Sequence, residues 1–389
     1  GSVSTINFVG DAVVATASPG AAGVSTVTIT GSFPVDSYEN LIAGTEAGAA
    51  VDNDTCYSVI LGYRAAKAWC NGSGSRGSVY IGNEAGCSLH TGNYNTFIGD
   101  TVGKTQTSGS SNTYIGRQIM RSGANTGNYN IYIGEEIASS SSDTTGEYNL
   151  SIGYYSHYQA TTASMNIAMG LWAGNNVTTG GCNIFIGKDA GYGNSTDYVT
   201  GNYNTILGPT FAGYKITSGA VNVVLGNRAG MCLTSGSYNT FLGPTAGGGG
   251  TVTGSNNIGV GFKAGHSISS GADNIFLGSC AGCFSATGSC NIAIGAGVTF
   301  TACNGSGQLA IGVGATHFIS GDSSYNVTLA GIATVTKSTG VVEATKFCGD
   351  GSCLSGVGFK ADAQENLYAG TCAGANSDAD TCFNIGIGY

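Results

Sequence analysis

Cysteine is one residue type in this sequence whose number and spacing could support chemistry. There are 13 cysteines among 389 residues, and Cys280 and Cys283 have the Cys-x-x-Cys spacing of redox motifs and zinc sites. No second such pair with nearby histidines follows, as a zinc site needs. The cysteines recur at fixed positions of a repeat, so we expect reduced thiols that act as small buried hydrophobic residues. Disulfides across an oligomer axis are the alternative.

The other residue types used in catalysis are scattered. The 22 Asp and Glu residues include no pair placed identically in successive segments, as glycoside hydrolysis would require. No Gly-x-Ser-x-Gly, P-loop or His-Glu-x-x-His motif occurs. We therefore expect no enzyme and no cofactor or metal site. The four histidines are isolated along the chain, and we expect them in turns or at the surface: His90, His157, His266 and His317.

The element that positions all these side chains is a five-residue repeat, Asn-x-x-(Ile/Leu)-Gly. It occurs in sixteen copies, and eight of the fifteen intervals between copies have the same length as the interval from Gly82 to Gly99. Such regular spacing is the signature of a solenoid. The closing glycines are Gly44, Gly62, Gly82, Gly99, Gly116, Gly134, Gly153, Gly170, Gly187, Gly208, Gly226, Gly243, Gly261, Gly278, Gly295 and Gly312.

Each copy predicts a short strand followed by turns. Alternation places Thr96 and Ile98 on one face of the strand and Asn95 and Phe97 on the other. The residue before the glycine is Ile, Leu, Val or Met in fifteen of the sixteen copies, so we expect the face of Thr96 and Ile98 to be buried. The face of Phe97 is apolar but more variable. Residues that define the repeat include Asn95, Ile98, Gly99, Asn183, Ile186, Gly187, Asn239, Leu242, Gly243, Asn274, Leu277 and Gly278.

These features predict an all-β fold, a parallel β-solenoid with coils of 17–18 residues. Ala-Gly pairs and turns rich in Ser, Thr and Gly would form the corners. Equivalent positions of stacked coils lie ~4.8 Å apart, so the Asn that opens thirteen of the sixteen copies can form a ladder of amides. A coil this thin has apolar residues on two faces, and we expect association into a homotrimer to cover the second.

The Asn-x-x-Ile-Gly…Ala-Gly unit resembles the head repeat of trimeric autotransporter adhesins, a left-handed parallel β-roll. It is more similar to repeat arrays in tail-fibre and other virion structural proteins of marine bacteriophages, especially those of cyanobacteria, with units such as 239–243 and 273–278. The similarity covers residues 36–312 and resumes at 362–389. It implies an intertwined homotrimeric fibre of a virion, assembled in the bacterial cytoplasm, that contacts other fibre or baseplate proteins and attaches to the host surface.

A second internal duplication divides the chain into segments. Residues 39–48 match residues 365–374, and Asp-Thr-Cys-Tyr at 54–57 recurs as Asp-Thr-Cys-Phe at 380–383. We therefore predict two β-rich connectors and two solenoid heads, of which the second is only begun. The predicted segments are a connector at 1–35, a head of about sixteen repeats at 36–312, a connector at 313–361 and the start of a second head at 362–389.

The three longest intervals between closing glycines, at 62–82, 134–153 and 187–208, are candidate binding loops, because insertions in solenoids lie at the surface. They carry or adjoin aromatic side chains beside polar residues, a combination that suits stacking on sugar rings. Alternatively, these aromatic side chains pack in an oligomer interface or lie in a solvated bulge. The candidate receptor contacts, for which a host surface glycan is the expected ligand, are Trp69, Tyr154, Tyr155, Tyr158, Tyr192 and Tyr198.

Composition excludes several classes of protein. The net charge of −9 argues against nucleic-acid binding. No stretch approaches the ~18–20 apolar residues of a transmembrane helix, so we expect no membrane insertion. Besides the virion fibre, two functions remain open. One is a trimeric adhesin or extracellular filament at a bacterial cell surface, and the other, less favoured, is a glycan depolymerase on a solenoid scaffold.

Overall fold

The computed structural model describes the side chains of residues 35–69, 76–140, 143–193, 196, 198–330 and 334–336. It also describes the backbone of short strands at 14–19, 25–30, 341–344, 367–369 and 385–387, and of residue 333. The chain divides into two compact units, Gly1–Val341 and Val342–Tyr389. Every regular element of the described ranges is a strand. Within them, no helix has the length and hydrophobicity needed to span a bilayer.

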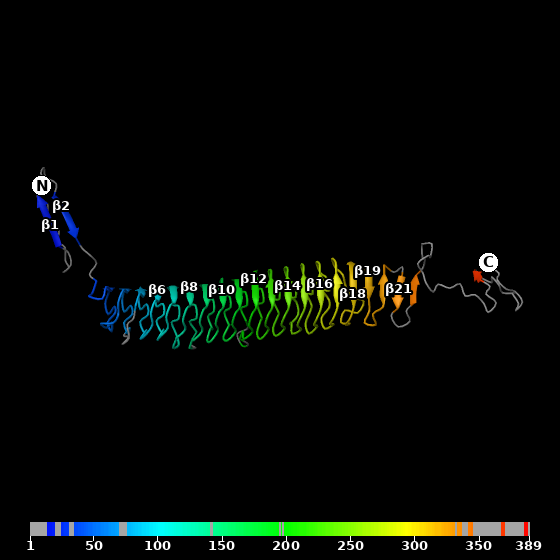
Figure 1. The fold of residues 1–389 in the computed structure, drawn as a ribbon, viewed down its shortest axis with the longest axis horizontal. Coiled ribbons are helices and arrows are strands. Elements are labelled where there is room, and N and C mark those ends of the chain that lie inside the picture. Colours follow the sequence, from blue (N-terminus) through cyan, green and yellow to red (C-terminus); the bar gives the residue numbers. More distant parts are fainter. Residues whose placement is uncertain are drawn as a thin grey trace. The chain divides into compact units, whose positions relative to one another are not determined.

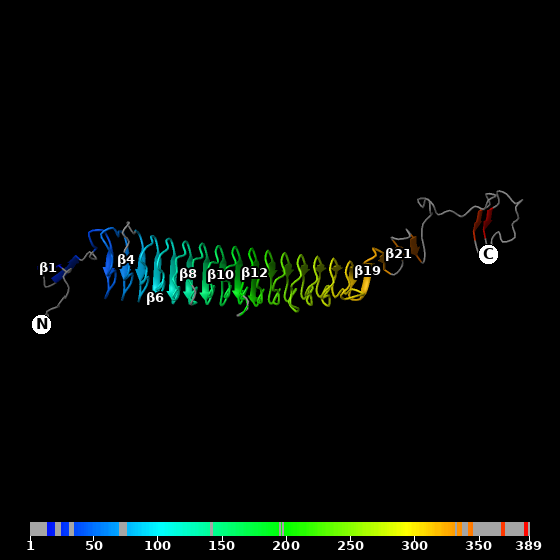
Figure 2. The same cartoon turned by 90° about the horizontal axis from the view of Figure 1, so that it is seen from below.

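Sixteen strands of the first unit, one for each repeat, form a parallel ladder (Figures 1 and 2). Equivalent residues pair between coils, as Phe97 does with Tyr114. The predicted parallel β-solenoid is thus confirmed. The strands are β3 Leu41–Ala43, β4 Val59–Leu61, β5 Val79–Ile81, β6 Thr96–Asp100, β7 Thr113–Arg117, β8 Ile131–Glu135, β9 Leu150–Tyr154, β10 Ile167–Met169, β11 Ile184–Lys188, β12 Thr205–Thr210, β13 Val223–Leu225, β14 Thr240–Leu242, β15 Ile258–Val260, β16 Ile275–Leu277, β17 Ile292–Ile294 and β18 Leu309–Val313.

Antiparallel strands continue the first unit at the end of this ladder. Strand β19 (Thr316–Gly321) pairs with β18, and β20 (Val327–Leu329) and β21 (Ala333–Thr336) follow in a meander. The remaining strands are β1 (Val14–Pro19), which pairs antiparallel with β2 (Ser25–Thr30), then β22 (Val341–Ala344), and in the second unit the parallel pair β23 (Leu367–Ala369) and β24 (Ile385–Ile387).

The register of the second unit repeats that of the first two coils. Leu367 pairs with Ile385 in β23 and β24, as Leu41 pairs with Val59 in β3 and β4. The spacing along the chain is the same in both pairs, and both fall on the duplicated sequence. Most of the predicted connector at 1–35 and of the second head at 362–389 lies outside the described residues, whereas the predicted connector at 313–361 contains β19, β20, β21 and β22.

Each coil turns at backbone positions in the left-handed region. In the coil of β6 these include Tyr94 (φ 58°), Gly99 (φ 133°), Thr101 (φ 55°) and Gly103 (φ 61°). A Cβ atom on Gly99 would overlap the carbonyl oxygen of Gly116 in the next coil. Glycine therefore closes the repeat because the stacked backbones approach one another too closely for any side chain.

The interior of the coil contains the Asn and aromatic face of each strand. Asn95 and Phe97 are fully buried, whereas Thr96 and Ile98 are partly exposed on the outer face. The prediction that the face of Thr96 and Ile98 is the buried one was therefore wrong. The coil interior has room for a ring because glycine occupies the facing corner: a Cβ on Gly103 would lie 2.6 Å from the Phe97 ring.

Rings from successive coils contact one another inside the first part of the solenoid, two pairs edge to face and two pairs stacked. Trp69, Tyr80, Phe97, Tyr114 and Tyr132 follow one another with ring centroids 5.2, 5.4, 4.5 and 5.1 Å apart. All five side chains are fully buried. Aromatic pairs at these separations stabilise a core beyond the area that they bury.

Buried asparagines form the predicted ladder of amides along the axis. Asn239 donates hydrogen bonds from its backbone nitrogen (2.9 Å) and from Nδ2 (3.2 Å) to Oδ1 of Asn222, and Nδ2 also donates to the carbonyl oxygen of Gly254 at 3.0 Å. Because a buried amide is costly unless it is hydrogen-bonded, this pattern explains why the position is Asn. The same pattern, in which the backbone nitrogen and Nδ2 both donate to Oδ1 of the preceding Asn, recurs at Asn130, Asn149, Asn166, Asn183, Asn204, Asn222, Asn257 and Asn274.

Candidate functional site

The corners that follow strands β9 to β12 carry a cluster of aromatic rings, which we call the aromatic patch. Trp172 and Tyr154 are exposed, and the other rings are half-buried. The patch lies on four successive coils and is made of Tyr154, Tyr155, Tyr158, Trp172, Tyr192, Phe211 and Tyr214.

Tyr154, Tyr155 and Tyr158 form one end of the aromatic patch. The rings of Tyr154 and Tyr155 lie 4.3 Å apart at 81°, and those of Tyr155 and Tyr158 lie 4.8 Å apart. A side-chain hydrogen bond with Tyr154, together with partial burial, raises the pKa of Tyr155 to about 12. The phenol of Tyr155 is therefore uncharged and can act as a hydrogen-bonding group at neutral pH.

Trp172, Tyr192 and Tyr214 form the other end. The Trp172 and Tyr192 rings are 6.5 Å apart and nearly perpendicular (77°), whereas Tyr192 stacks on Tyr214 at 5.0 Å and 14°. The side-chain nitrogen of Lys188 lies 5.5 Å from the centre of the Trp172 ring and 2.6 Å from the Asp189 carboxylate. Its charge is therefore balanced within the protein.

The solenoid register brings these residues together. Tyr158 and Tyr192 are each the fifth residue after a closing glycine, and Asn175 holds that position in the coil between them. Backbone hydrogen bonds fix the stack: Gln159 N donates to Asn175 O at 2.9 Å, and Asn176 N donates to Tyr192 O at 3.0 Å. Side chains that are a whole coil apart in the sequence thus become neighbours.

An open hollow of about 300 Å³ lies among these side chains. Its polar lining consists of amides and phenols. Asn175 donates from Nδ2 to the carbonyl oxygen of Tyr155 (2.8 Å), but the buried Nδ2 of Asn176 has no hydrogen-bond partner among the described residues. The hollow is lined by Tyr155, Tyr158, Gln159, Trp172, Asn175, Asn176 and Tyr192.

Of the six candidate contacts, the structure brings four into the aromatic patch: Tyr154, Tyr155, Tyr158 and Tyr192. Tyr198 is exposed and does not line the hollow. Trp69 is fully buried, so its assignment as a surface contact was wrong.

The position of Trp69 in the repeat explains its burial. It is the seventh residue after a closing glycine, the position that Leu89 and Val177 occupy in other coils. Both of these side chains are also fully buried. The extra residues of the long interval therefore follow this position, and Trp69 remains in the core.

Trp172, Asn176 and Tyr214 are members of the site that sequence reasoning missed. Trp172 and Asn176 lie in an interval of ordinary length, so a search of long intervals could not find them. The position of Trp172 in the repeat nevertheless indicates a surface residue. It is the second residue after its closing glycine, a position that the charged residues Glu46, Arg64 and Glu84 occupy in other coils.

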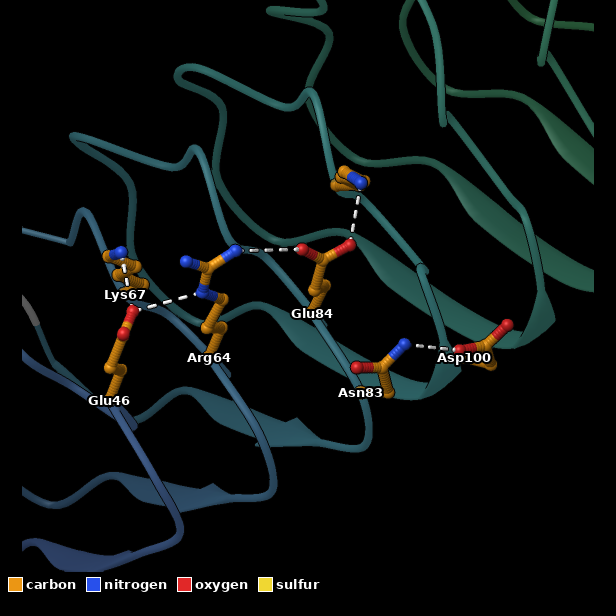
Figure 3. A network of polar contacts seen from close by, with 7 residues as sticks. Glu46, Arg64, Lys67, Asn83, Glu84 and Asp100 are labelled. Atoms are coloured by element: carbon orange, nitrogen blue, oxygen red, sulfur yellow. Dashed lines mark hydrogen bonds and ion pairs between the residues drawn. The ribbon is translucent and has the colours of Figure 1, made fainter.

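That second position carries a ladder of opposite charges in the first coils (Figure 3). Arg64 Nε donates to Glu46 at 2.9 Å and a second nitrogen of Arg64 lies 3.7 Å from Glu84, while Lys104 lies 2.6 Å from Glu84. The side chains are partly exposed, so each pair contributes little to stability. The ladder links charged side chains of neighbouring coils to one another.

The outer face of the parallel ladder is a second candidate surface, which we call the outer stripe. It consists of the residues at the positions of Thr96 and Ile98 in each of the sixteen copies. All are Thr, Ala or larger apolar residues, and none is charged. Its most exposed members include Leu225, which is 50% exposed. Other large side chains of the stripe that are exposed are Ile115, Ile131, Ile133, Val223, Ile258 and Val260.

One histidine lies in a turn, as expected, but is not exposed. The side chain of His157 is fully buried, and its Nδ1 is 2.7 Å from the hydroxyl of Ser151. Burial lowers its pKa to about 4. His90 is exposed, and His266 and His317 are half-buried.

The cysteines of the described ranges are free thiols in mixed environments. Cys232 and Cys283 are buried, as expected for small hydrophobic residues, but Cys290 and Cys303 are exposed. Burial and a hydrogen bond with the Cys280 thiol raise the pKa of Cys283 to about 11. In that part of the chain, no three His, Cys, Asp or Glu side chains are grouped as a metal site requires.

Comparison of the chain with protein-family models, with curated proteins and with solved structures found no match. The aromatic patch and the outer stripe are thus the two surfaces from which a function can be proposed.

Proposed function

We propose that this chain is a structural fibre protein of a bacteriophage virion, a tail fibre or similar appendage, that provides reach and host-surface attachment as a homotrimer. The outer stripe is the observation that carries the proposal. Sixteen strands at ~4.8 Å, each with two outward residues ~7 Å apart, cover roughly 500 Å². A patch of this size is near the upper end of what a monomeric protein leaves exposed, and patches of that size often mark an interaction surface.

The spacing of the stripe favours a second copy of this chain as its partner. Its side chains repeat with every coil, and only a surface with the same repeat stays in phase over sixteen coils. A parallel copy of the chain has that repeat. Exposed tyrosines precede five of the thirteen repeat asparagines, among them Tyr94, Tyr203 and Tyr238, and would bring the area closer to the ~800 Å² per partner of a stable interface.

The assignment to a virion follows from the resemblance of the repeat to phage fibre proteins. The fold suits that role, because each added coil extends the stack by ~4.8 Å and sixteen coils span roughly 75 Å. The partners that we propose are two further copies of this chain, other fibre or baseplate proteins, and a host surface glycan.

Light scattering on the purified chain tests the assembly. We expect three times the 38.8 kDa mass of one chain. Leu225→Lys and Ile133→Lys each place a charge on the outer stripe and should shift the mass toward one chain. Phe284→Lys changes a side chain that is also exposed but lies off the stripe, and should leave the mass unchanged. A wild-type monomer at micromolar concentration would contradict the proposal.

Labelling with antibodies to the purified chain tests the location. Electron microscopy of virions and cells from the source culture should show label on virion appendages. Label confined to cell surfaces would instead support the bacterial adhesin or filament.

A further inference from the structure

We propose that the hollow beside Trp172 and Asn176 binds an uncharged pyranose ring of a surface glycan. The inference rests on the proposed attachment function, since it names the ligand class of that function and the coils that contact it.

Asn176 is the first observation that indicates a ligand. Its side chain is only 4% exposed, lines the hollow, and has an Nδ2 without a hydrogen-bond partner in the described part of the chain. Its backbone is fully engaged, since Asn176 N donates to Tyr192 O and Asn176 O accepts from Val199 N at 2.9 Å. A buried donor without an acceptor costs free energy. A sugar hydroxyl or ring oxygen in the hollow would supply that acceptor.

The neighbouring coils pack closely on one side of Asn176 and add a second amide on the other. Gly193 stands at the position of Asn176 in the next coil, where a Cβ would lie only 3.1 Å from Cβ of Asn176 and 2.7 Å from the Val199 side chain. Gln159 stands at the same position in the preceding coil and lines the hollow with a second amide. Amides donate and accept hydrogen bonds, as the hydroxyl groups of a sugar also do.

The rings supply the apolar contact that a sugar requires. Trp172 is 37% exposed, and Tyr192, nearly perpendicular to it, is held in place by stacking on Tyr214. The face of an aromatic ring carries partial negative charge, so it attracts the weakly positive C–H groups of a pyranose. The volume of about 300 Å³ is at the low end of the range for small-molecule sites, which suits one or two sugar units.

Charge balance favours an uncharged sugar over a sialic or uronic acid. Among the described residues, no Asp, Glu, Lys or Arg lines the hollow. The cation that contacts Trp172 is Lys188, whose ammonium group is paired at 2.6 Å with the buried carboxylate of Asp189. A charged ligand would therefore lose hydration without gaining a counter-charge.

Titration of the purified chain with a panel of neutral oligosaccharides (glucans, mannans and galactans) tests the inference. We expect binding with a Kd near or below ~1 mM for at least one class. Trp172→Ala and Asn176→Ala should each weaken it about tenfold or more. Phe262→Ala is the matched control, since Phe262 is also exposed and lies under a lysine, Lys263, at 5.3 Å, and it should bind as the wild type does.

Tryptophan fluorescence gives a readout that needs no variant. The chain has two tryptophans, and Trp69 is fully buried, so a soluble quencher reports on Trp172. A bound sugar should protect Trp172 from quenching. No binding and no protection at ~10 mM sugar, or binding that Trp172→Ala and Asn176→Ala leave unchanged, would overturn the inference. So would protection of Trp172 by a purified protein partner only.

The two proposals fail in different ways. A chain that is trimeric but does not bind sugar would contradict only the sugar-binding proposal. A chain that binds sugar but is monomeric and absent from virions would contradict the fibre proposal and support the sugar site.

Discussion

The side-chain oxygen of Asn112 accepts two hydrogen bonds from Asn130, one from the backbone nitrogen at 2.9 Å and one from Nδ2 at 3.3 Å. The two residues occupy the same position of adjacent coils. Each Asn of the ladder thus holds the next coil in register with a buried polar group, and this coupling leads to the first prediction.

Asn130→Leu should destabilise the solenoid by about 2–4 kcal/mol. It removes the Nδ2 donor to Asn112 and to the carbonyl of Gly146, and leaves the backbone nitrogen of Asn149 without its acceptor. Asn83→Leu, which removes one exposed bond to Asp100, should cost under about 0.5 kcal/mol. Urea unfolding compares the two. Equal losses would mean that the buried amides are not what holds the coils in register.

Phe185→Asp should impair folding, whereas Ile186→Asp should impair association. Phe185 is fully buried, so a carboxylate there should cost several kcal/mol and disrupt nearby coils. Ile186 lies on the outer face, so its variant should stay folded as an isolated chain but associate less. Circular dichroism separates folding from association when it is read alongside light scattering. Unfolding by Ile186→Asp with little effect of Phe185→Asp would restore the reverse assignment of the faces.

Gly99→Ala should destabilise the chain by about 3 kcal/mol or more, because the new Cβ meets the backbone of Gly116 as well as an unfavourable φ of 133°. Gly314→Ala is a matched control. Gly314 also has a positive φ (57°), but no described residue lies within 4 Å of its Cβ position, so its cost should be about 1 kcal/mol. Thermal melting of both variants distinguishes crowding between coils from backbone strain alone.

Acidification from pH 6.5 to 4 should destabilise the chain through His157. Its pKa is lowered from 6.5 to about 4 in the fold, so in this range the unfolded chain binds a proton that the folded chain does not. The stabilisation is complete above about pH 6.5 and falls by about 3 kcal/mol on reaching pH 4.

His157→Gly should lack this part of the pH dependence because it removes the imidazole. Glycine suits the backbone of this corner, since Gly174 holds the same position in the next coil with a φ of 55°, against 46° at His157. The difference between the two pH profiles of unfolding free energy isolates the histidine from the carboxylates. Parallel profiles, or an imidazole that titrates near pH 6.5 by NMR, would contradict the prediction.

The sequence predicts the solenoid well because the backbone geometry of the coil restricts which residues can stand at the repeated positions. The position of Gly99 admits only glycine, and the ladder position favours Asn, so the glycine marks every copy of the repeat and the Asn marks thirteen of the sixteen. The inside of the coil was assigned wrongly because both faces of the strand are apolar, and alternation shows which residues share a face but not which face is buried. The sharing of one face by Asn95 and Phe97 was the available clue, since a ladder of amides belongs inside.

The candidate site could be predicted only in part for a related reason. Tyr155, Tyr158 and Tyr192 lie in or near long intervals, which mark surface loops. Trp172 and Asn176 lie in an ordinary coil and gain their importance from neighbours in the preceding and following coils. Their contribution depends on the exact stacking of corners, which spacing alone does not show. Trp69 was misplaced because the extra residues of its interval come after it.

The antiparallel pairing of β19 with β18 gives the parallel ladder a fixed length. Such a ladder can in principle accept one more strand at its edge, and the edge of β18 is instead occupied by a strand of opposite direction. The number of coils is thus set by the gene and not by polymerisation at this end. Insertion or deletion of whole repeats between β6 and β18 should change the length of the ladder in steps of ~4.8 Å. The number of repeats encoded in the sequence therefore sets the distance that the ladder spans.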